Sequence, residues 1–266
     1  MGLTIPLIPG VVVFEILNTC VCTFHFTPQM AQRLAQISEE DWNAMLPEAD
    51  KIVAKVNETI KNTAWEEEKQ YKKTNIKYCY GVVPGSTFKA IKGHVKVQGD
   101  IRKALAYDLS FSEITPDMPK AARDGRACKY MYFHDKETEK YCKKLSNEVL
   151  DFKPVVFLLH QVNQAGVPMV SDREFVTLRV ARELADNKGF EVVSGDVSPK
   201  QDFGVKKAVR AQIQNRCWYE VINDHEFEVN IFFFCDPCGK IPASLFTATL
   251  EHQMEFLVNV ENMMKK

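Results

Sequence analysis

The sequence lacks an excess of charge of either sign. Its 266 residues include 34 lysines and arginines against 35 aspartates and glutamates, which gives a formal net charge of -1. Proteins that bind nucleic acid through its phosphates usually present a strongly positive surface. We therefore expect no nucleic-acid partner. With 45% hydrophobic and 26% charged residues, the composition is that of an ordinary globular protein with enough apolar material for a large core.

Clustered cysteines are also lacking. The 8 cysteines are scattered, and no set of cysteines and histidines has the spacing of a zinc site. We expect no metal and no cofactor, and the scattered thiols favour a reducing, cytoplasmic location. The single Cys-x-x-Cys element, Cys235 to Cys238, encloses Asp-Pro and is typical of a tight turn, with a redox or metal role as the alternative.

The N-terminal segment has no clean membrane-spanning pattern. Residues 3–26 are strongly apolar, but prolines interrupt the run early and Glu15 lies near its centre. A carboxylate at the centre of a bilayer costs roughly 2.5–3.5 kcal/mol. The basic start of a secretory signal is missing too. We treat residues 1–27 as an extension of unknown role, either packed on the domain or used for targeting or peripheral membrane contact, and 28–266 as the domain.

Helical periodicity occupies both ends of this domain. From Thr27 to Ile60, apolar residues at spacings of three and four predict one long interrupted helix or two short ones, with breaks near Ser38 and Pro47. Ile241-Pro242 begins a second predicted helix. One apolar stripe along it contains Phe246, Leu250, Met254, Leu257, Val260 and Met264.

Period-two alternation predicts strands between these helices. The predicted strands are 65–72, 76–80, 91–97, 145–152, 155–162, 174–182, 190–194, 209–219 and 226–234. A short helix capped by Asp100 covers 100–105, and 115–142 is predicted to be helical in pieces. Nothing repeats and no flexible linker divides the chain. The order predicts one α+β domain, in which a curved antiparallel sheet wraps around a long C-terminal helix.

Three stretches resemble motifs of the StAR-related lipid-transfer (START) family. Residues 170–179, Val-Ser-Asp-Arg-Glu-Phe-Val-Thr-Leu-Arg, resemble that family's Arg-Asp-Phe-Val-x-x-Arg strand. Val209-Arg210-Ala211 is similar to its Val-Arg-Ala strand. Residues 232–242 are similar to its Asp-x-x-Gly-x-(Leu/Ile)-Pro turn into the last helix. The motifs come in the family's order, and the likeness covers roughly Trp65 to the C-terminus.

The resemblance implies a helix-grip fold and a role in lipid binding and transfer. One sterol, phospholipid, ceramide or similar molecule would lie in a tunnel between the sheet and the last helix. The gate would be the loop 163–170, with Gly166, Val167, Pro168 and Met169, together with the helix stripe within 245–257. Exchange would need transient contact with a membrane surface. We expect a monomer, cytoplasmic or peripherally attached to a membrane.

Arg179 is the residue that most needs an explanation. It shares a strand face with Phe175 and Thr177, and alternation does not say which face of that strand is inside. A buried arginine needs a partner, because an unpaired buried charge costs several kcal/mol. In the sterol-binding branch of the family a carboxylate on the preceding strand pairs with this arginine, whereas ungapped counting places His160 there. The Arg-x-x-Trp-Asp element of the phosphatidylcholine-binding branch is absent. The ligand therefore stays open.

The expected ligand contacts follow from these patterns. His160 is either a structural residue or a hydrogen-bond partner for a ligand hydroxyl. The rings of Tyr78 and Tyr80 would form wall, with their hydroxyls as further candidates. Arg179, Phe175 and Thr177 would contribute from the strand. The helix would contribute Phe246, Leu250, Met254 and Leu257.

Two other functions remain as alternatives. Helix-grip relatives include cyclases and hydrolases, and His160 with Arg179 would be the acid and the electrostatic stabiliser of such an enzyme. However, the sequence has no nucleophile elbow, no His-Glu-x-x-His and no phosphate-binding loop, so we expect no enzyme. A ligand sensor that presents a closed gate to a protein partner is the other alternative.

Overall fold

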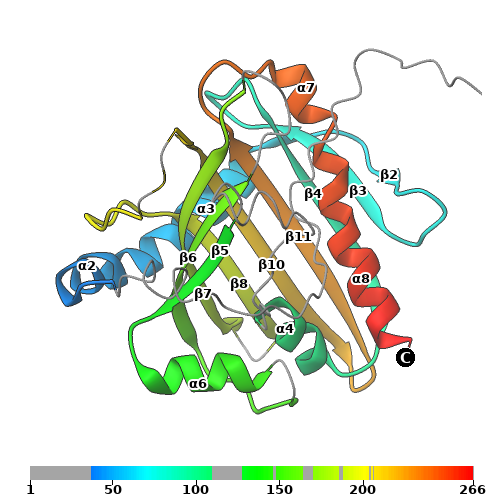
Figure 1. The fold of residues 1–266 in the computed structure, drawn as a ribbon. Coiled ribbons are helices and arrows are strands. Elements are labelled where there is room, and N and C mark those ends of the chain that lie inside the picture. The colour runs from blue at the N-terminus through cyan, green and yellow to red at the C-terminus, as the bar shows by residue number, and fades with distance from the viewer. Residues whose placement is uncertain are drawn as a thin grey trace, which may run out of the picture.

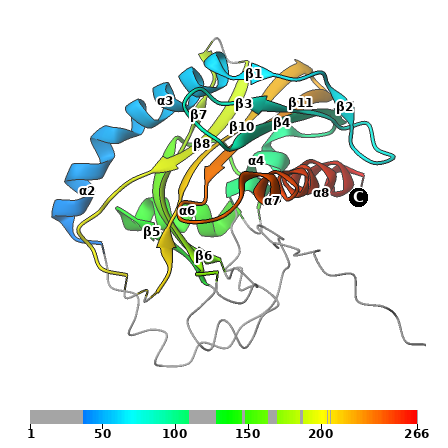
Figure 2. The same ribbon diagram turned by 90° about the horizontal axis from the view of Figure 1, so that it is seen from above.

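The computed structural model describes residues 37–109, 128–145, 148–163, 170–185, 188–203, 205 and 207–265. A single curved sheet forms the centre of the molecule (Figure 1). Helices pack on both of its faces (Figure 2). The predicted α+β arrangement, with the sheet curving around the C-terminal helix, is confirmed.

Among the described residues two α-helices precede the sheet, which is the second of the two predicted alternatives. α2 (Glu39–Met45) begins after Ser38, whose hydroxyl oxygen accepts a hydrogen bond from the Asp41 amide at 3.1 Å. A short 3-10 turn, η1 (Leu46–Glu48), contains Pro47, which cannot donate within a continuing helix. α3 (Ala49–Asn62) follows and buries an apolar face against β7, β8 and β10.

The sheet has the order β1-β3-β4-β11-β10-β8-β7-β6-β5, with β2 pairing β3 and β9 pairing β7. Its strands are β1 (Ala64–Trp65), β2 (Lys69–Gln70), β3 (Lys77–Val82), β4 (Lys89–Gln98), β5 (Cys128–Phe133), β6 (Val155–Asn163), β7 (Arg173–Glu183), β8 (Gly189–Asp196), β9 (Val209–Arg210), β10 (Gln212–Asn223) and β11 (Glu226–Asp236). In the described part of the chain every pairing is antiparallel except β7 with β9.

The remaining helices lie on the other side of the sheet from α3 (Figure 2). α4 (Ile101–Leu109) and α6 (Lys136–Leu145) come from the middle of the chain. The C-terminal helix is broken into α7 (Ala243–Thr247), a 3-10 segment η3 (Leu250–Met254) and α8 (Glu255–Met264). Most of its predicted stripe survives these breaks: Phe246, Leu250, Met254, Leu257 and Val260 are buried, and Met264 is partly buried.

Two glycines distinguish the faces of the sheet. A Cβ added at Gly93 would lie 2.4 Å from the Met254 sulfur of η3, whereas one at Gly195 would lie 2.7 Å from Ile52 of α3. We call the side that faces the C-terminal helix the inner face and the side that faces α3 the outer face. Because directly paired residues share a face and successive residues alternate, the register then assigns every strand position.

Two predictions in the middle of the chain are wrong. The predicted strand 145–152 is not a strand in its described residues: α6 ends at Leu145, and 148–154 has no regular structure. There the Tyr141 hydroxyl accepts from the Lys153 amide and donates to the Asp151 carbonyl, contacts that a strand would make with a neighbouring strand. Conversely, Cys128–Phe133, predicted to be helical, is the edge strand β5.

No helix among the described residues is long and apolar enough to cross a bilayer.

Candidate functional site

A charged pair is buried on the inner face. Arg179 of β7 donates from Nη2 to Oδ1 of Asp108 at 2.8 Å, and the hydroxyl of Tyr219 on β10 donates to Oδ2 of the same carboxylate at 3.0 Å. Both charged side chains are only 5% exposed. The guanidinium carbon also lies 5.8 Å from the centre of the Phe157 ring on β6. We call Asp108, Arg179 and Tyr219 the inner polar cluster.

The inner polar cluster brings together a helix and two strands that are distant in the sequence. Asp108 lies in the last turn of α4, where the helix dipole disfavours an anion. The arginine supplies the compensating charge. Burial and the neighbouring Asp108 carboxylate raise the pKa of Tyr219 well above its ordinary value, so its hydroxyl stays protonated and donates.

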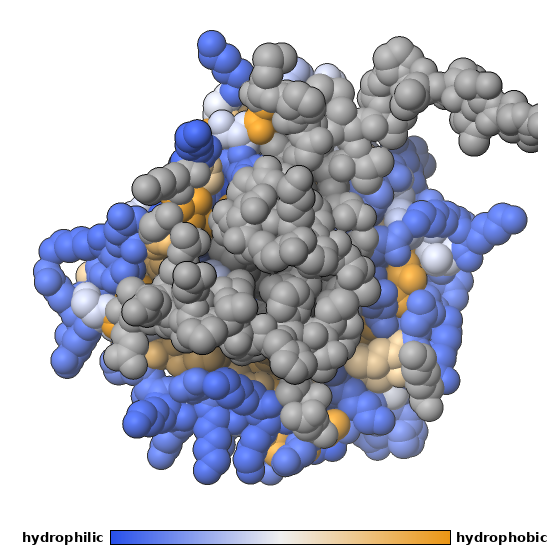
Figure 3. All heavy atoms as spheres, viewed as in Figure 1, coloured by the Kyte–Doolittle hydropathy of each residue, from blue (hydrophilic) through white to orange (hydrophobic). Residues whose placement is uncertain are grey.

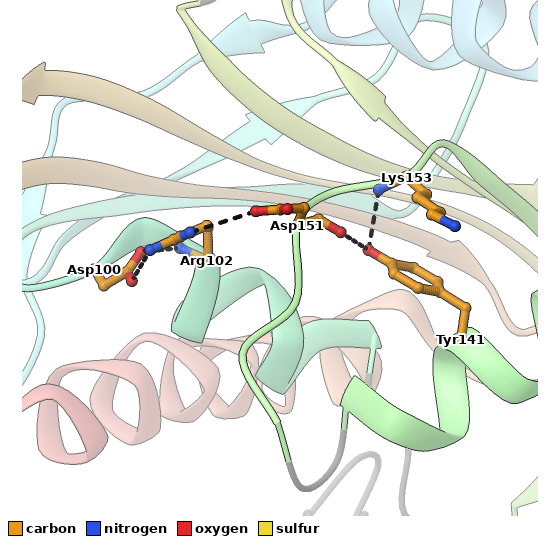
Figure 4. Close-up of polar contacts among 5 residues, drawn as sticks. All are labelled: Asp100, Arg102, Tyr141, Asp151 and Lys153. Atoms are coloured by element: carbon orange, nitrogen blue, oxygen red, sulfur yellow. Dashed lines mark hydrogen bonds and ion pairs between the residues drawn. The ribbon is translucent and has the colours of Figure 1, made fainter.

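A second network fixes the start of α4 (Figure 4). Asp100 precedes the helix and accepts hydrogen bonds from the Arg102 amide at 2.9 Å and from the Arg102 guanidinium at 2.8 Å. These bonds lower the pKa of the Asp100 carboxyl. Arg102 also lies 3.7 Å from Asp151, whose carbonyl accepts from Tyr141 of α6. These contacts fix the N-terminal end of α4, and because the helix is short they also fix the position of Asp108 in its last turn.

Phe175 and Thr177 lie where alternation placed them relative to Arg179. Directly paired residues lie on the same face, and they connect Gly93 on β4 to β7. The successive partners are Ile231 on β11, Cys217 on β10, Val192 on β8 and Ala181 on β7. Counting back in steps of two places Arg179, Thr177 and Phe175 on this face. All three are buried.

The four predicted helix residues face the sheet. Phe246 makes an edge contact with Phe88, with ring centres 5.5 Å apart. Met254 approaches Gly93, where the absence of a side chain leaves room for its sulfur. Leu250 and Leu257 are at most 1% exposed. These residues therefore share the inner side with the inner polar cluster.

Tyr78 and Tyr80 lie on the inner face, and their hydroxyls contact the C-terminal helix. Both donate to Oε1 of Glu251 in η3, at 2.6 and 2.9 Å. Their rings pack edge to face, with centres 5.8 Å apart. Burial, reinforced by the Glu251 hydrogen bond, raises the pKa of Tyr78 to about 12. The structure thus gives these hydroxyls a role in holding the helix that the sequence pattern did not suggest.

His160 does not face the interior. It lies opposite Val176, on the outer face, so it and Arg179 point to opposite sides of the sheet. Its Nε2 lies 3.0 Å from Glu174, and its ring stacks on Phe203 with centres 4.2 Å apart. The predicted alternative of a ligand contact is therefore withdrawn, as is the paired acid and stabiliser of an enzyme. Ungapped counting failed because the residue of β6 opposite Arg179 is Phe157.

Asp108 is the partner that sequence reasoning missed. The only available signal was local: helical spacing places this carboxylate with Ala104 and Leu105, on a buried stripe. A lone acidic residue on such a stripe indicates a buried partner but does not identify it.

The first and last of the three START-like motifs, residues 170–179 and 232–242, contact each other. Arg173, at the start of β7, donates to the backbone carbonyls of Pro237 at 2.5 Å, Cys238 at 3.1 Å and Ser171. In that turn Asp236 accepts from the Cys238 amide at 2.8 Å, and Gly239 has φ +72°. The predicted turn at the Cys-x-x-Cys element is confirmed, and Cys235 and Cys238 are free thiols. The predicted gate residues Gly166, Val167, Pro168 and Met169 lie outside the described residues.

Solved structures share this architecture. Human StAR-related lipid transfer protein 5 matches with a TM-score of 0.57 at 12% identity, over 84% of this chain and 97% of that one. The chain has the START-domain fold. A STAR-related lipid transfer protein from Xanthomonas axonopodis matches with a TM-score of 0.51 at 16% identity, over 76% and 99% of the two chains.

A third START structure agrees. The lipid transfer and protein localization domain of human StarD13 matches with a TM-score of 0.50 at 15% identity, over 79% and 93% of the chains. No protein-family model matches the sequence, and no curated protein matches it. The START likeness is therefore one of fold.

Proposed function

We propose that the protein binds one hydrophobic ligand between the inner face and the C-terminal helix, and carries it between membranes. The observation that carries this proposal is the inner polar cluster, a buried charged pair with a tyrosine on a face that also buries many apolar side chains. Apolar burial would supply the affinity, at on the order of 25 cal/mol per Å². The cluster would orient the ligand's polar end. Two of the START-fold structures described above are named as lipid transfer proteins, which points the same way.

The charge of the inner polar cluster favours a neutral polar end. Asp108 and Arg179 sum to zero, so an ionised headgroup placed beside them would lack a counter-charge in a buried site. A hydroxyl, ester or amide can exchange hydrogen bonds with the cluster without that penalty. We therefore propose a sterol, a ceramide or another lipid with an uncharged polar group as the ligand class.

We further propose that Phe175, Thr177, Phe246, Leu250, Met254 and Leu257 line the apolar part of the site. All six are buried on the side where the cluster lies. Exchange would require the C-terminal helix to move from the sheet, together with the loop that contains residues 166–169. Such motions are slow compared with side-chain motion.

The test begins with protein purified under native conditions and extracted with solvent. Lipid mass spectrometry should find one class of neutral lipid at close to one molecule per protein. Transfer of that lipid between donor and acceptor vesicles should then depend on protein concentration. Absence of any stoichiometric lipid, together with no binding from a panel of neutral lipids, would overturn the proposal.

A ligand sensor would share the binding step and differ afterwards. Binding without vesicle-to-vesicle transfer, combined with capture of a protein partner only in the lipid-loaded state, would replace carriage by sensing.

A further inference from the structure

One hairpin concentrates positive charge in a chain that is neutral overall. Residues 69–77, from β2 to β3, hold four lysines and no acidic residue, whereas the whole chain has a net charge of -1. Three glutamates come directly before this segment; of these, Glu66 binds Lys89 and Glu68 lies 3.4 Å from His94. Lys69, Lys72, Lys73 and Lys77 are all exposed. We call this segment the lysine hairpin.

The lysine hairpin projects at one edge of the sheet, beside the C-terminal helix (Figures 1 and 2). Hydrophilic side chains cover that margin of the molecule in the space-filling view (Figure 3). A projecting basic element can meet a flat anionic surface without the rest of the protein intervening. This geometry suits a membrane better than it suits a concave partner.

Lys72 forms the turn of the hairpin in a conformation that favours glycine. Its φ is +50°, and the Thr74 amide donates to the Tyr71 carbonyl across the turn. A lysine in this region is strained, so its side-chain contacts must offset the cost. Its ammonium group binds the Glu255 carboxylate and lies 4.6 Å from the centre of the Tyr71 ring. The side chain is nevertheless 63% exposed, so a competing anion can reach it.

Glu255 connects this lysine to the C-terminal helix. It is the first residue of α8, and its Oε1 also accepts a hydrogen bond from the Tyr71 hydroxyl at 2.5 Å. The Lys72 hydrogen bond is the main reason that the pKa of the Glu255 carboxyl is lowered. One turn earlier, Glu251 accepts from Tyr78 and Tyr80. The helix is thus held against β2 and β3 through two carboxylates, and one of these depends on a lysine that solvent anions can reach.

We propose that the lysine hairpin docks on anionic membranes, and that lipid phosphates compete with Glu255 for Lys72, so that docking loosens the C-terminal helix. This inference rests on the proposed lipid-carrier function and adds the surface and the trigger. Each lysine near an anionic surface contributes about a fivefold gain in binding, which salt weakens. Neutral vesicles would therefore be bound weakly.

The docking test uses the full chain and flotation with vesicles of phosphatidylcholine, with or without phosphatidylserine. Wild type should bind the phosphatidylserine vesicles, and added salt should release it. The triple variant Lys69→Gln, Lys73→Gln, Lys77→Gln should bind them on the order of a hundredfold more weakly. The matched control, Lys51→Gln, Lys61→Gln, Lys143→Gln, removes three exposed lysines elsewhere and should bind like wild type.

Equal losses in the two triple variants, or no preference of wild type for phosphatidylserine, would overturn the docking proposal. Because lysines on an edge strand also oppose strand-to-strand association, size-exclusion chromatography must first show that both variants have the wild-type size. Binding of an acidic protein or of nucleic acid by the hairpin, with vesicle binding unaffected by its variants, would assign the surface to another partner and overturn the proposal as well.

The trigger is tested by two single variants. Lys72→Gln should weaken vesicle binding only about fivefold, yet should abolish the phosphatidylserine-dependent increase in hydrogen exchange of α8. Glu255→Gln should leave docking intact and raise α8 exchange even without anionic lipid. Unchanged α8 exchange in both variants would overturn the trigger.

Loss of these effects in a protein that still retains and transfers lipid would leave the proposed function standing. A protein that docks normally but holds no lipid would instead overturn the proposed function.

Discussion

The two faces of β7 use buried charge in different ways. On the outer face Glu174 lies 3.0 Å from His160 on the adjacent strand and 3.4 Å from Arg210, its β9 register partner. On the inner face Arg179 is paired with Asp108, which belongs to a helix. Outer-face charges thus join neighbouring strands, whereas the inner-face charge joins the sheet to an element that crosses it.

A second outer-face group shows the same local pattern. Glu191 of β8 accepts from Arg182 on β7 at 2.6 Å and from Arg216 on β10 at 2.7 Å. Those arginine side chains are 38% and 18% exposed, against 5% for Arg179. Glu191 itself is only 3% exposed, so the difference lies in the arginines: Arg182 and Arg216 can turn toward water, and Arg179 cannot. The comparison predicts that removing one charged partner lowers the free energy of unfolding more on the inner face than on the outer face.

The largest effect is expected from Arg179→Met. It leaves the Asp108 carboxylate buried without a counter-charge, which should lower the free energy of unfolding by about 3–5 kcal/mol. Adding Asp108→Leu should recover most of that loss, since the remaining group would be apolar. Urea unfolding followed by circular dichroism measures both. If the free energy of unfolding of Arg179→Met alone were within about 1 kcal/mol of wild type, the pair would not be buried as described.

A smaller loss is expected from Glu191→Gln on the outer face. Arg182 and Arg216 lose their shared carboxylate but can turn toward solvent, so about 1–2 kcal/mol should be lost. The same urea titration applies. A loss equal to that of Arg179→Met would remove the distinction between the faces.

Tyr219→Phe should cost about 1.5 kcal/mol, the lower end of the range for a hydrogen bond to a charged group, because the carboxylate keeps its arginine. The variant should change the amount of bound lipid more clearly than it changes the free energy of unfolding. Bound neutral lipid, measured by extraction and mass spectrometry, should decrease, whereas Glu191→Gln should retain the wild-type amount. Equal lipid content in the two variants would contradict the assignment of the polar end.

A further comparison is a pH dependence of opposite sign on the two faces. Burial raises the pKa of Asp196, which shares the inner face with its partner Thr177, to about 6. The folded state therefore holds this proton more tightly, and stability from this group decreases as pH rises from about 4 to about 6. On the outer face the His160 hydrogen bond lowers the pKa of Glu174, so its contribution is lost as pH falls below about 4.5.

Asp196→Asn should flatten the first slope and Glu174→Gln the second, in urea titrations at a series of pH values. An unchanged slope between about pH 4 and about pH 6 in Asp196→Asn would show that the Asp196 carboxyl is solvated in the folded protein.

Local pattern predicted the strands and the helix stripe, because each depends on the spacing of neighbouring residues. β6, β7 and β11 lie close to their predicted positions. The stripe residues Phe246, Leu250, Met254 and Leu257 are buried, as the helical spacing indicated. Alternation also grouped Phe175, Thr177 and Arg179 on one face. It could not decide which face was inner, since both sides of β7 are covered.

Contacts between distant segments could not be read from the sequence. Asp108 reaches Arg179 only because α4 lies against β8 and β10, and no periodicity relates those positions. Similarly, Tyr78 and Tyr80 were predicted as wall, but their bonds to Glu251 depend on the docking of the C-terminal helix. The strand at 145–152 failed because side-chain bonds from Tyr141 replaced a sheet partner.

Native mass spectrometry of the intact protein tests the central claim most directly, that the inner side encloses one ligand oriented by Asp108, Arg179 and Tyr219. Wild type is expected to carry one added mass, a neutral lipid, and the Asp108→Leu, Arg179→Met double variant is expected to lose it while remaining folded. A protein that shows only its own mass, even after incubation with neutral lipids, would contradict the account.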